Sequence, residues 1–417
     1  MATASDIRAA VVAGRLSDAA ALTRPLVEAL TGTSVESITF TSDAYALNSV
    51  SGRVYQADGA ELFFKFHVED GEQDNVSEYY RASVLADAGL PVEVPVAISA
   101  EPGQQFVLYE IRNEPRMVDV CLDVDRSAGP NAALSEPIEA ARRDLDRRIG
   151  EVLVETLHVD STGARSSLHQ LFHHRLTDSV GAFPGGRYAS WYLNDATFTS
   201  VADAHWTING TSYASTLAEL VAQARELMNP HTFADQPVVT AHGDDHHGNV
   251  WVINDDGAPS LRLFDPAFAG TDVPALLALV KPTFHNVFAH PYWIYHPDEV
   301  LLSDVTLSRD GEEIDVSDPL TLSPMRQQIL DSIAQEAWLP LLCCMKERGL
   351  LPSNWRAIVR SALFLCPFLV TNLVAPERPE LLRTIGLGHA LATGSEPSAG
   401  TDPLTDILTW LEGQIAT

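Results

Sequence analysis

The chain has 417 residues, 46% hydrophobic and 20% charged, a composition typical of a soluble globular protein long enough for two lobes. Its 27 basic and 56 acidic residues give a net charge of −29, which disfavours nucleic acid as a partner and suits a cationic small molecule. A solvated acidic surface explains this charge equally well. No apolar run approaches the roughly 20 residues of a membrane helix, and the N-terminus lacks a secretory-signal pattern, so we expect a cytoplasmic protein without membrane contact.

Short runs rich in aromatic and β-branched residues predict a sheet in the first part of the chain. These runs are Val35 to Thr41, Arg53 to Ala57, Glu61 to His67, Val94 to Ser99, and Gln105 to Ile111. Turn residues separate them, and one helix is predicted from Asn75 to Ala88 because its apolar residues recur at helical spacing. This order predicts a small, mainly antiparallel β lobe.

Lysine is rare in this chain. Only three of the 27 basic residues are lysines, namely Lys65, Lys281 and Lys346. Lys65 lies inside an apolar strand, which invites a chemical explanation. Glu78, on the helix that follows, is placed to form an ion pair that aims the Lys65 ammonium at two phosphates, with Glu69 and Glu72 as competitors. The alternative is an edge-strand lysine whose ammonium reaches solvent and a solvated helix carboxylate.

The connection into the second strand contains small residues that let backbone amide groups approach a phosphate. These residues are Ser49, Ser51 and Gly52. With a single glycine, an ordinary hairpin connection explains this segment about as well.

The remainder of the chain is predicted to be mainly helical. The predicted helices are Pro137 to Leu157, Thr211 to Met228, Met325 to Gly349, and Trp355 to Val374. A β-hairpin around Asp310-Gly311, from Val305 to Val316, is predicted as a peripheral insertion, and Gly394 to Pro403 as a polar loop.

Carboxylate and amide groups recur at a specific spacing in the middle of the chain. Asp244 follows His242-Gly243 after an apolar strand, and Asn249 comes five residues later. A predicted hairpin then returns the chain so that Asp265 lies near Asn249. Phosphoryl transfer needs a carboxylate beside the acceptor hydroxyl and oxygen ligands for magnesium. Asp244 suits the first role, and Asn249 and Asp265 suit the second.

The neighbouring histidines allow a second interpretation. His246 and His247 beside Asp244 suggest a transition-metal site, as in a metal-dependent hydrolase. However, the position two residues after His242 is Asp244 and not a second histidine, and no other His/Asp cluster has matching spacing. His246 or His247 is expected to line the mouth of the site or to bond the loop.

The motif from His242 to Asn249, with Asp265, resembles that of the aminoglycoside phosphotransferase and choline kinase-like family, which has a protein-kinase-like fold. Gly243 and Pro266 stand where protein kinases have Arg and Phe, which points to small-molecule kinases. The resemblance implies an α+β, bilobal fold. The small β N-lobe, with an N-terminal helical extension, would span residues 1–110 and bind phosphates. The larger helical C-lobe, residues 111–417, would hold the catalytic loop, the metal site and the acceptor pocket.

The resemblance also implies residue roles. Asp244 is the catalytic base, while Asn249 and Asp265 bind Mg²⁺. Lys65 holds the α- and β-phosphates of ATP, and Glu78 anchors Lys65.

The end of the last strand of the small lobe is the candidate hinge for the adenine edge. It comprises Tyr109, Glu110 and Ile111, for which an ordinary core strand is the alternative interpretation. We expect an ATP- and magnesium-dependent kinase that acts on a hydroxyl of an aminoglycoside-like or other sugar, an amino alcohol or a related metabolite. A regulatory nucleotide-binding pseudokinase is the alternative, and a metal-dependent hydrolase is a third possibility.

Acceptor recognition is expected in the helical lobe. Aromatic residues gather there at Tyr188, Trp191, Tyr192 and Trp206, and again at Pro291 to Tyr295. Their faces suit a cationic acceptor, although for any one of them packing in the core is the better-supported reading. His285 and Asn286 follow Asp265 closely enough to be placed near the acceptor.

Overall fold

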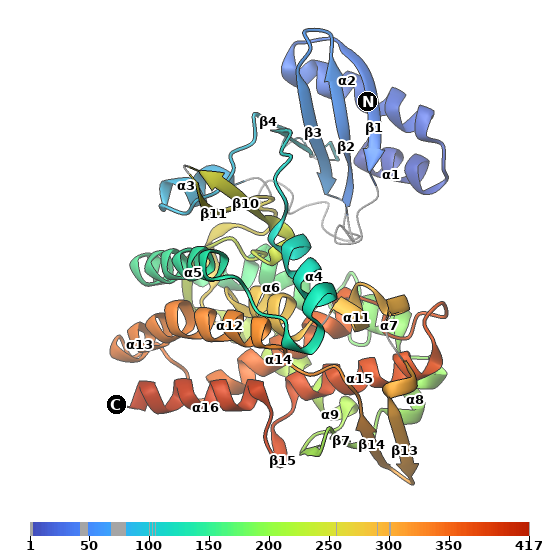
Figure 1. The fold of residues 1–417 in the computed structure, drawn as a ribbon, viewed down its shortest axis with the longest axis vertical. Coiled ribbons are helices and arrows are strands. Elements are labelled where there is room, and N and C mark those ends of the chain that lie inside the picture. The colour runs from blue at the N-terminus through green and yellow to red at the C-terminus, as the bar shows by residue number, and fades with distance from the viewer. Residues whose placement is uncertain are drawn as a thin grey trace.

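The protein is divided into a small lobe and a larger lobe, which Figure 1 shows one above the other. The computed structural model describes residues 3–41, 49–67, 81–99, 101, 103–104, 106–255, 257–289, 291–299 and 302–416. The small lobe is a mainly antiparallel sheet with two helices, and the larger lobe is mainly helical. The expected α+β, bilobal fold is therefore confirmed.

The small lobe is built on a five-stranded sheet with the strand order β1-β2-β3-β5-β4, in which all neighbours are antiparallel. The strands are β1 (Val35–Thr41), β2 (Ser49–Gln56), β3 (Glu61–His67), β4 (Ala97–Ser99) and β5 (Phe106–Glu110). The bounds of β1 and β3 agree with the prediction. In β3, Phe64 and Phe66 are fully buried, and the alternation of side chains along a strand turns Lys65 to the other face of the sheet.

Two helices precede the sheet, α1 (Ala4–Val12) and α2 (Leu16–Thr31). They pack against each other, and α2 also contacts β1 and β4. Ile7 and Val27 from these helices share a core with Phe64 and Phe66. The core of the small lobe therefore lies on the face of β3 opposite to Lys65.

Residues 81–93, which precede β4, pack with the larger lobe. Helix α3 (Ala82–Asp87) covers part of the helix predicted from Asn75 to Ala88, whose first residues lie outside the described part of the chain. Leu85 and Leu90 belong to the core of the larger lobe. This segment therefore joins the two lobes at their boundary, beside β11.

Helices form most of the larger lobe. They are α4 (Met117–Ala128), α5 (Glu136–Thr156), α6 (Ser167–His174), α7 (Gly186–Trp191), α8 (Ala196–Val201), α9 (Leu217–Leu227), α10 (Val280–Thr283), α11 (Pro291–Ile294), α12 (Pro324–Ile333), α13 (Leu339–Glu347), α14 (Trp355–Val370), α15 (Glu380–Gly394) and α16 (Pro403–Ala416). Single π-helical turns are η6 (Phe284–Phe288) and η9 (Ala334–Trp338). Short 3₁₀ turns are η2 (Gly129–Asn131), η3 (Ser161–Arg165), η4 (Pro230–Phe233), η5 (His247–Asn249), η7 (Pro297–Glu299) and η8 (Leu302–Asp304). Helix α5, helix α14 and the run α12–η9–α13 confirm three of the four predicted helices.

The prediction of one helix from Thr211 to Met228 is wrong at its start. Thr211 and Tyr213 lie in a strand, and the helix begins only after Thr216, whose hydroxyl accepts a hydrogen bond from the Glu219 backbone N–H. The early residues pair instead with the strand His205–Ile208 across the Asn209-Gly210 turn, and with the distant strand Pro397–Ala399. The Asn-Gly turn is a local hairpin signal, and the prediction did not use it.

The predicted hairpin around Asp310-Gly311 is present, and it belongs to a second five-stranded sheet with the order β13-β14-β7-β8-β15. Its strands are β7 (His205–Ile208), β8 (Thr211–Tyr213), β13 (Thr306–Asp310), β14 (Glu313–Ser317) and β15 (Pro397–Ala399). β15 lies within Gly394 to Pro403, so this segment is not loop throughout. The sheet lies at the lower edge of the larger lobe in Figure 1.

Two small sheets carry the motif. β9 (Pro237–Ala241) pairs with β12 (Gly270–Pro274) and with β6 (His158–Val159), and β10 (Val250–Asp255) pairs with β11 (Ala258–Leu263). Every residue of β9 is buried. The loop that follows β9 is therefore anchored in the core of the larger lobe.

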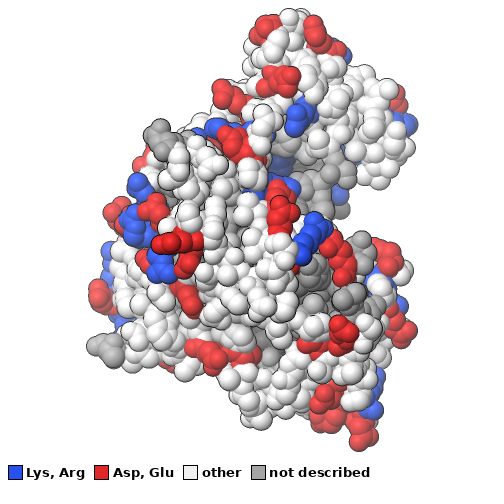
Figure 2. Space-filling view, in the orientation of Figure 1, with Lys and Arg blue, Asp and Glu red and all other residues white. Residues whose placement is uncertain are grey.

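A hollow separates the two lobes on the face that Figure 2 shows, and basic and acidic side chains both lie around it. Within the described part of the chain, we find no helix that combines the length and the apolarity needed to cross a membrane.

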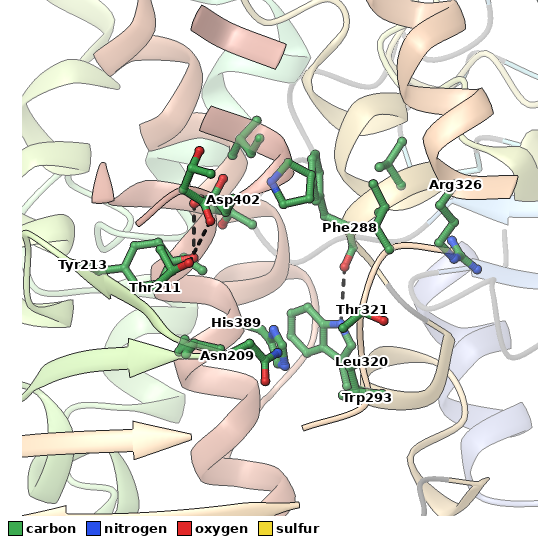
Figure 3. Close-up of a pocket in the computed structure, with 18 residues that line it drawn as sticks. Asn209, Thr211, Tyr213, Phe288, Trp293, Leu320, Thr321, Arg326, His389 and Asp402 are labelled. Atoms are coloured by element: carbon green, nitrogen blue, oxygen red, sulfur yellow. Dashed lines mark hydrogen bonds between the residues drawn. The ribbon is translucent and has the colours of Figure 1, made fainter. Parts of the chain in front are cut away.

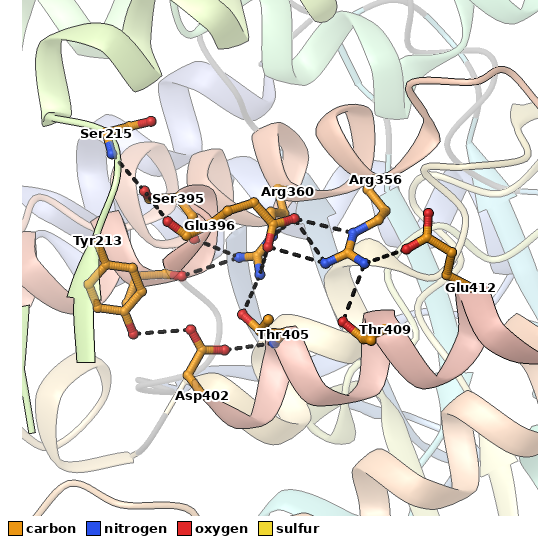
Figure 4. Close-up of polar contacts among 11 residues, drawn as sticks. Tyr213, Ser215, Arg356, Arg360, Ser395, Glu396, Asp402, Thr405, Thr409 and Glu412 are labelled. Atoms are coloured by element: carbon orange, nitrogen blue, oxygen red, sulfur yellow. Dashed lines mark hydrogen bonds and ion pairs between the residues drawn. The ribbon is translucent and has the colours of Figure 1, made fainter. Parts of the chain in front are cut away.

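The C-terminal helix is held by a buried arginine (Figure 4). Arg360 on α14 is 2% exposed. It donates hydrogen bonds to the Ser395 carbonyl oxygen at 2.9 Å, to the Thr405 hydroxyl at 2.7 Å and to Glu396 at 3.0 Å. Arg356, one turn earlier, binds Glu396 and Glu412 near the surface. Arg360 therefore links α14, the end of α15 and the start of α16.

Substitution Arg360→Met should lower the free energy of unfolding by about 3 kcal/mol, because it leaves buried acceptors without a donor. Arg356→Met should cost less than about 1 kcal/mol, because its ion pairs are exposed to solvent. Urea denaturation of both variants tests this difference. Equal losses would show that the buried arginine contributes no more than the surface one.

Candidate functional site

The loop after β9 is held in a tight turn by Gly243 and His242. Gly243 has a φ of +76°, and a Cβ atom there would lie 2.9 Å from the Phe268 carbonyl oxygen. His242 Nδ1 accepts from the Asp244 backbone N–H at 3.2 Å, and its Nε2–H donates to the Phe264 carbonyl oxygen at 2.9 Å. Burial lowers the pKa of His242 to about 4, so the imidazole is neutral and can accept a hydrogen bond at Nδ1 while it donates one from Nε2. His242 thus connects the backbone of Asp244 to the residue before Asp265.

The β10–β11 hairpin brings Asn249 and Asp265 together, as predicted. Val250 pairs with Leu263, and the Phe264 N–H donates to the Asn249 carbonyl oxygen at 3.0 Å. The Asn249 side-chain amide donates to the Asp244 carbonyl oxygen at 2.8 Å, which directs its Oδ1 the other way. Asp265 has a φ of +56°, a conformation that is strained for a residue with a Cβ. Two oxygen donors of the kind that Mg²⁺ prefers therefore converge at the end of the hairpin.

Lys65 reaches across from the small lobe and forms an ion pair with Asp265. Both side chains are largely buried, with 16% and 12% exposed, so the pair is shielded from bulk water. The ammonium shows that the Asp265 carboxylate faces a position suited to a cation. Glu78, the predicted partner of Lys65, and its competitors Glu69 and Glu72 lie outside the described residues.

The small residues predicted to approach phosphate were placed in the connection before the second strand, but they lie in β2 itself, beside Lys65. Ser51 pairs with Lys65 in the strand register, and its buried hydroxyl lies 2.9 Å from that of Thr41. A Cβ atom on Gly52 would collide with the Thr39 carbonyl oxygen and the Phe64 ring, so packing within the sheet already requires a glycine there. The backbone of Ser49 pairs with His67 at the end of the same strands.

The predicted hinge lies where β5 leaves the small lobe. Tyr109 is buried opposite Phe63, Glu110 is paired with Leu62, and Ile111 follows the strand. No partner of the Tyr109 hydroxyl is found among the described residues, and burial raises the pKa of this phenol, with the Glu93 carboxylate adding to the effect.

Glu93, which the sequence analysis missed, fixes the linker after the hinge. Its buried carboxylate accepts hydrogen bonds from Arg112 Nε at 2.6 Å and from Trp251 Nε1 at 2.9 Å. Its backbone N–H donates to the Leu263 carbonyl oxygen at 2.7 Å. Glu93 therefore ties the linker between the lobes to both strands of the β10–β11 hairpin.

Lys281 contacts Asp244 at the centre of the site, and nothing in the sequence analysis indicated this contact. Its Nζ lies 3.1 Å from Asp244 Oδ1 and 3.9 Å from the centroid of the Phe268 ring. Lys281 is 4% exposed and belongs to the short helix α10. Burial by itself would raise the pKa of Asp244, but Lys281, followed by His246 and His285, holds it well below its usual range. Asp244 is therefore an anion in this structure.

Asp244 and Asp245 are adjacent but differ in their surroundings. Asp245 is 3% exposed, and burial raises its pKa to about 7, although Arg142 opposes the shift. Of the two neighbouring carboxylates, only Asp244 has a lysine against it among the described residues. The structure thus distinguishes the ionised acid from the one that burial drives towards its neutral form.

The two histidines after Asp245 face different ways. His246 Nε2 lies 3.8 Å from Asp244 Oδ1, and its ring lies 5.4 Å from that of His285. His247 instead turns inward, where its Nδ1 lies 3.5 Å from Cys121 Sγ and its backbone N–H donates to Asn286 Oδ1 at 2.7 Å. Asn286, expected near the acceptor, therefore supports the loop from behind. Burial lowers the pKa of both His246 and His285.

The aromatic residues divide between core and cavity. Tyr192 stacks on Phe368 at 4.1 Å and donates its hydroxyl to a backbone oxygen, so it belongs to the core. Trp206 is fully buried as well. Trp293, by contrast, lines a cavity of about 250 Å³ together with Phe288 and His389 (Figure 3). Tyr295 contacts His285 of η6, with its hydroxyl 2.5 Å from His285 Nδ1.

Comparison with known proteins gives similarity at the level of structure only. No family model matches the chain, and no curated protein matches its sequence. A spectinomycin phosphotransferase in complex with ADP and spectinomycin is 14% identical, over 89% of this chain and 98% of that chain, with a TM-score of 0.36. A macrolide 2'-phosphotransferase type I is 10% identical, over 90% of this chain and 96% of that chain, with a TM-score of 0.40. A microcompartment-associated aminopropanol kinase is 13% identical, over 90% of this chain and 95% of that chain, with a TM-score of 0.36.

These phosphotransferases and kinases are proteins to which this chain is similar in overall arrangement.

Substitution Gly243→Ala should lower the free energy of unfolding by about 3 kcal/mol, because it adds a clash with Phe268 to the cost of a positive φ. The matched control is Gly311→Ala, at a φ of +63° with no atom within 4 Å of the new Cβ. The control should lose only about 1 kcal/mol. Chemical denaturation of both variants measures the two losses, and equal values would exclude the clash.

Proposed function

We propose that the protein is an ATP- and magnesium-dependent phosphotransferase that moves the γ-phosphoryl group to a hydroxyl of a small molecule. The observation that carries the proposal is the convergence of Lys65, from the small lobe, with Asp244, Asn249 and Asp265, from the larger one. These groups supply the cation, the carboxylate and the oxygen ligands that phosphoryl transfer needs, and they do so at the boundary of two lobes.

The residues present fit a magnesium ion. The Asn249 side-chain NH₂ donates a hydrogen bond to the Asp244 carbonyl oxygen, so its Oδ1 points away from Asp244. The Asp265 carboxylate already faces a cationic group, the Lys65 ammonium. These two side chains would hold the metal, together with phosphate oxygens. When bound, magnesium neutralises the charge on the β- and γ-phosphates. With the metal on Asp265, Lys65 would be released to bind the α- and β-phosphates.

In the proposed reaction, the acceptor oxygen forms a bond to the γ-phosphorus as the bond between that phosphorus and the β–γ bridging oxygen breaks. ADP leaves with the electron pair of the broken bond. Asp244 orients the acceptor hydroxyl and takes its proton late in the transfer. A weakly basic carboxylate suffices for this role, because positioning matters more than proton abstraction when the transition state is loose. The low pKa of Asp244 is therefore compatible with the proposal.

The acceptor is proposed to be a sugar, an amino alcohol or a related hydroxyl metabolite, in the cytoplasm. A net charge of −29 suits a cationic acceptor. A nucleotide-binding pseudokinase is the alternative function. The two neighbouring histidines do not share a metal-site geometry, because His247 turns away from Asp244, so nothing specific favours a metal-dependent hydrolase.

Substitution Asp244→Asn should lower kcat by about 10³-fold while ATP still binds, because the acceptor hydroxyl loses its orienting carboxylate. The acceptor for this assay comes from an ADP-release screen across sugars, aminoglycosides, amino alcohols and nucleosides. A variant that turns over the identified acceptor at the parent rate would show that Asp244 is not the base. If the parent protein binds nucleotide but turns over no compound of the panel, the pseudokinase would be favoured.

Substitution Lys65→Met should weaken the binding of ATP with magnesium by about tenfold or more, because a charge-assisted contact to the phosphates is lost. Thermal shift with ATP, with and without magnesium, measures this. Lys346→Met, at an exposed lysine on α13, serves as the control and should leave the shift unchanged. If the parent protein gave no shift with any nucleoside triphosphate and bound stoichiometric zinc, the phosphotransferase proposal would be wrong.

A further inference from the structure

Asp244 and Asp265, the two acids with proposed roles in the reaction, each have a lysine against them. Lys65 contacts Asp265, and Lys281 contacts Asp244, although the chain has only three lysines among its 27 basic residues. The third, Lys346, lies on the surface. The Lys65–Asp265 pair is accounted for by the proposed phosphate and metal roles, whereas the Lys281–Asp244 pair is not.

Lys281 is held rigidly in this position. Its ammonium lies between the Asp244 carboxylate and the face of the Phe268 ring, and helix α10 packs against α14 behind it. Only 5% of the Lys281 side chain and 16% of the Asp244 side chain are exposed. A buried ammonium is costly unless an anion compensates it, so the two charges stabilise each other.

The contact also fixes the direction of the carboxylate. Lys281 Nζ and His246 Nε2 both approach Oδ1 of Asp244, at 3.1 Å and 3.8 Å. For both groups Oδ1 is the nearer carboxylate oxygen, and across the residues that the structure describes we find no hydrogen bond to Oδ2. Oδ2 is thus the oxygen left for an acceptor hydroxyl.

We propose that Lys281 is the built-in counter-ion of the catalytic carboxylate. It holds Asp244 by Oδ1 and neutralises its charge, so that the γ-phosphate of ATP can approach without facing an uncompensated anion. The inference rests on the proposed phosphotransferase function and assigns Lys281 as a positioning residue, because it acts through Asp244.

The proposal makes a charge-specific prediction. The γ-phosphate adds negative charge close to Asp244, whereas ADP ends one phosphate earlier. Removing the Lys281 charge should therefore weaken binding of a triphosphate more than binding of a diphosphate. Removing the Asp244 charge as well should cancel the effect, because the pair is then neutral again. If Lys281 were only structural, its loss would weaken triphosphate and diphosphate binding alike, and removing the Asp244 charge as well would not restore the affinity for the triphosphate.

The test measures the affinities of ADP and of a non-hydrolysable ATP analogue, each with magnesium, by calorimetry on the full chain. In Lys281→Met the analogue should bind about tenfold more weakly while ADP changes by less than about threefold. The double variant Asp244→Asn/Lys281→Met should return the ratio of the two affinities to within about threefold of the parent value. Lys281→Arg, which keeps the charge, should resemble the parent, as should Lys346→Met.

The outcomes separate the inference from the proposed function. A parent protein that binds neither nucleotide overturns both. A parent that binds both nucleotides, with an unchanged ratio in Lys281→Met, overturns only the counter-ion role. If Lys281→Met does not fold, the double variant and Lys281→Arg decide, because both avoid an unpaired buried charge. A double variant that still discriminates against the triphosphate then contradicts the proposal.

Discussion

The ion pair between Lys65 and Asp265 is the contact through which the two lobes present their polar groups to one site. Lys65 stands on the face of β3 that is turned away from the small-lobe core, and Asp265 stands at the end of the β10–β11 hairpin. The linker is fixed independently by Glu93, which bonds Arg112 and Trp251. Because both lobes are anchored at this boundary, the lysine of one lobe can serve the carboxylates of the other.

A strongly acidic protein that handles a polyphosphate must control charge within the site. With a net charge of −29, the chain places two of its three lysines against Asp244 and Asp265, the two acids with proposed roles in the reaction. Burial makes these pairs stronger than pairs on the surface, since there is less solvent to screen them. An acidic surface is therefore compatible with a locally neutral site, because the acidic surface charges are exposed to solvent whereas the ion pairs of the site are buried.

The sequence predicts much of the fold because many of its signals are local. The strand around Lys65 is rich in aromatic residues, α5 is a long helical segment, and the hairpin that returns Asp265 to Asn249 is short. The prediction failed at Thr211 to Tyr213, which were placed in a helix although they pair with β7 across the Asn209-Gly210 turn and with the distant β15. The Asn-Gly turn is a local hairpin signal that the prediction did not use, whereas β15 leaves no local signal. Asn286 bonds the His247 backbone, and its place near the acceptor stays a prediction.

The sequence by itself determined the order of Asp244, Asn249 and Asp265 and the convergence of the last two, since hairpin geometry follows from a short turn between apolar strands. It also marked Lys65 as unusual. Only the tertiary structure decided that Lys65 faces Asp265 and that Lys281 faces Asp244. Lys281 sits in an apolar run with no local signal of its partner, and its ammonium meets Asp244 only because α10 packs beneath the loop after β9. Spacing along the chain records local geometry, whereas the pairing of buried charges depends on which elements pack together.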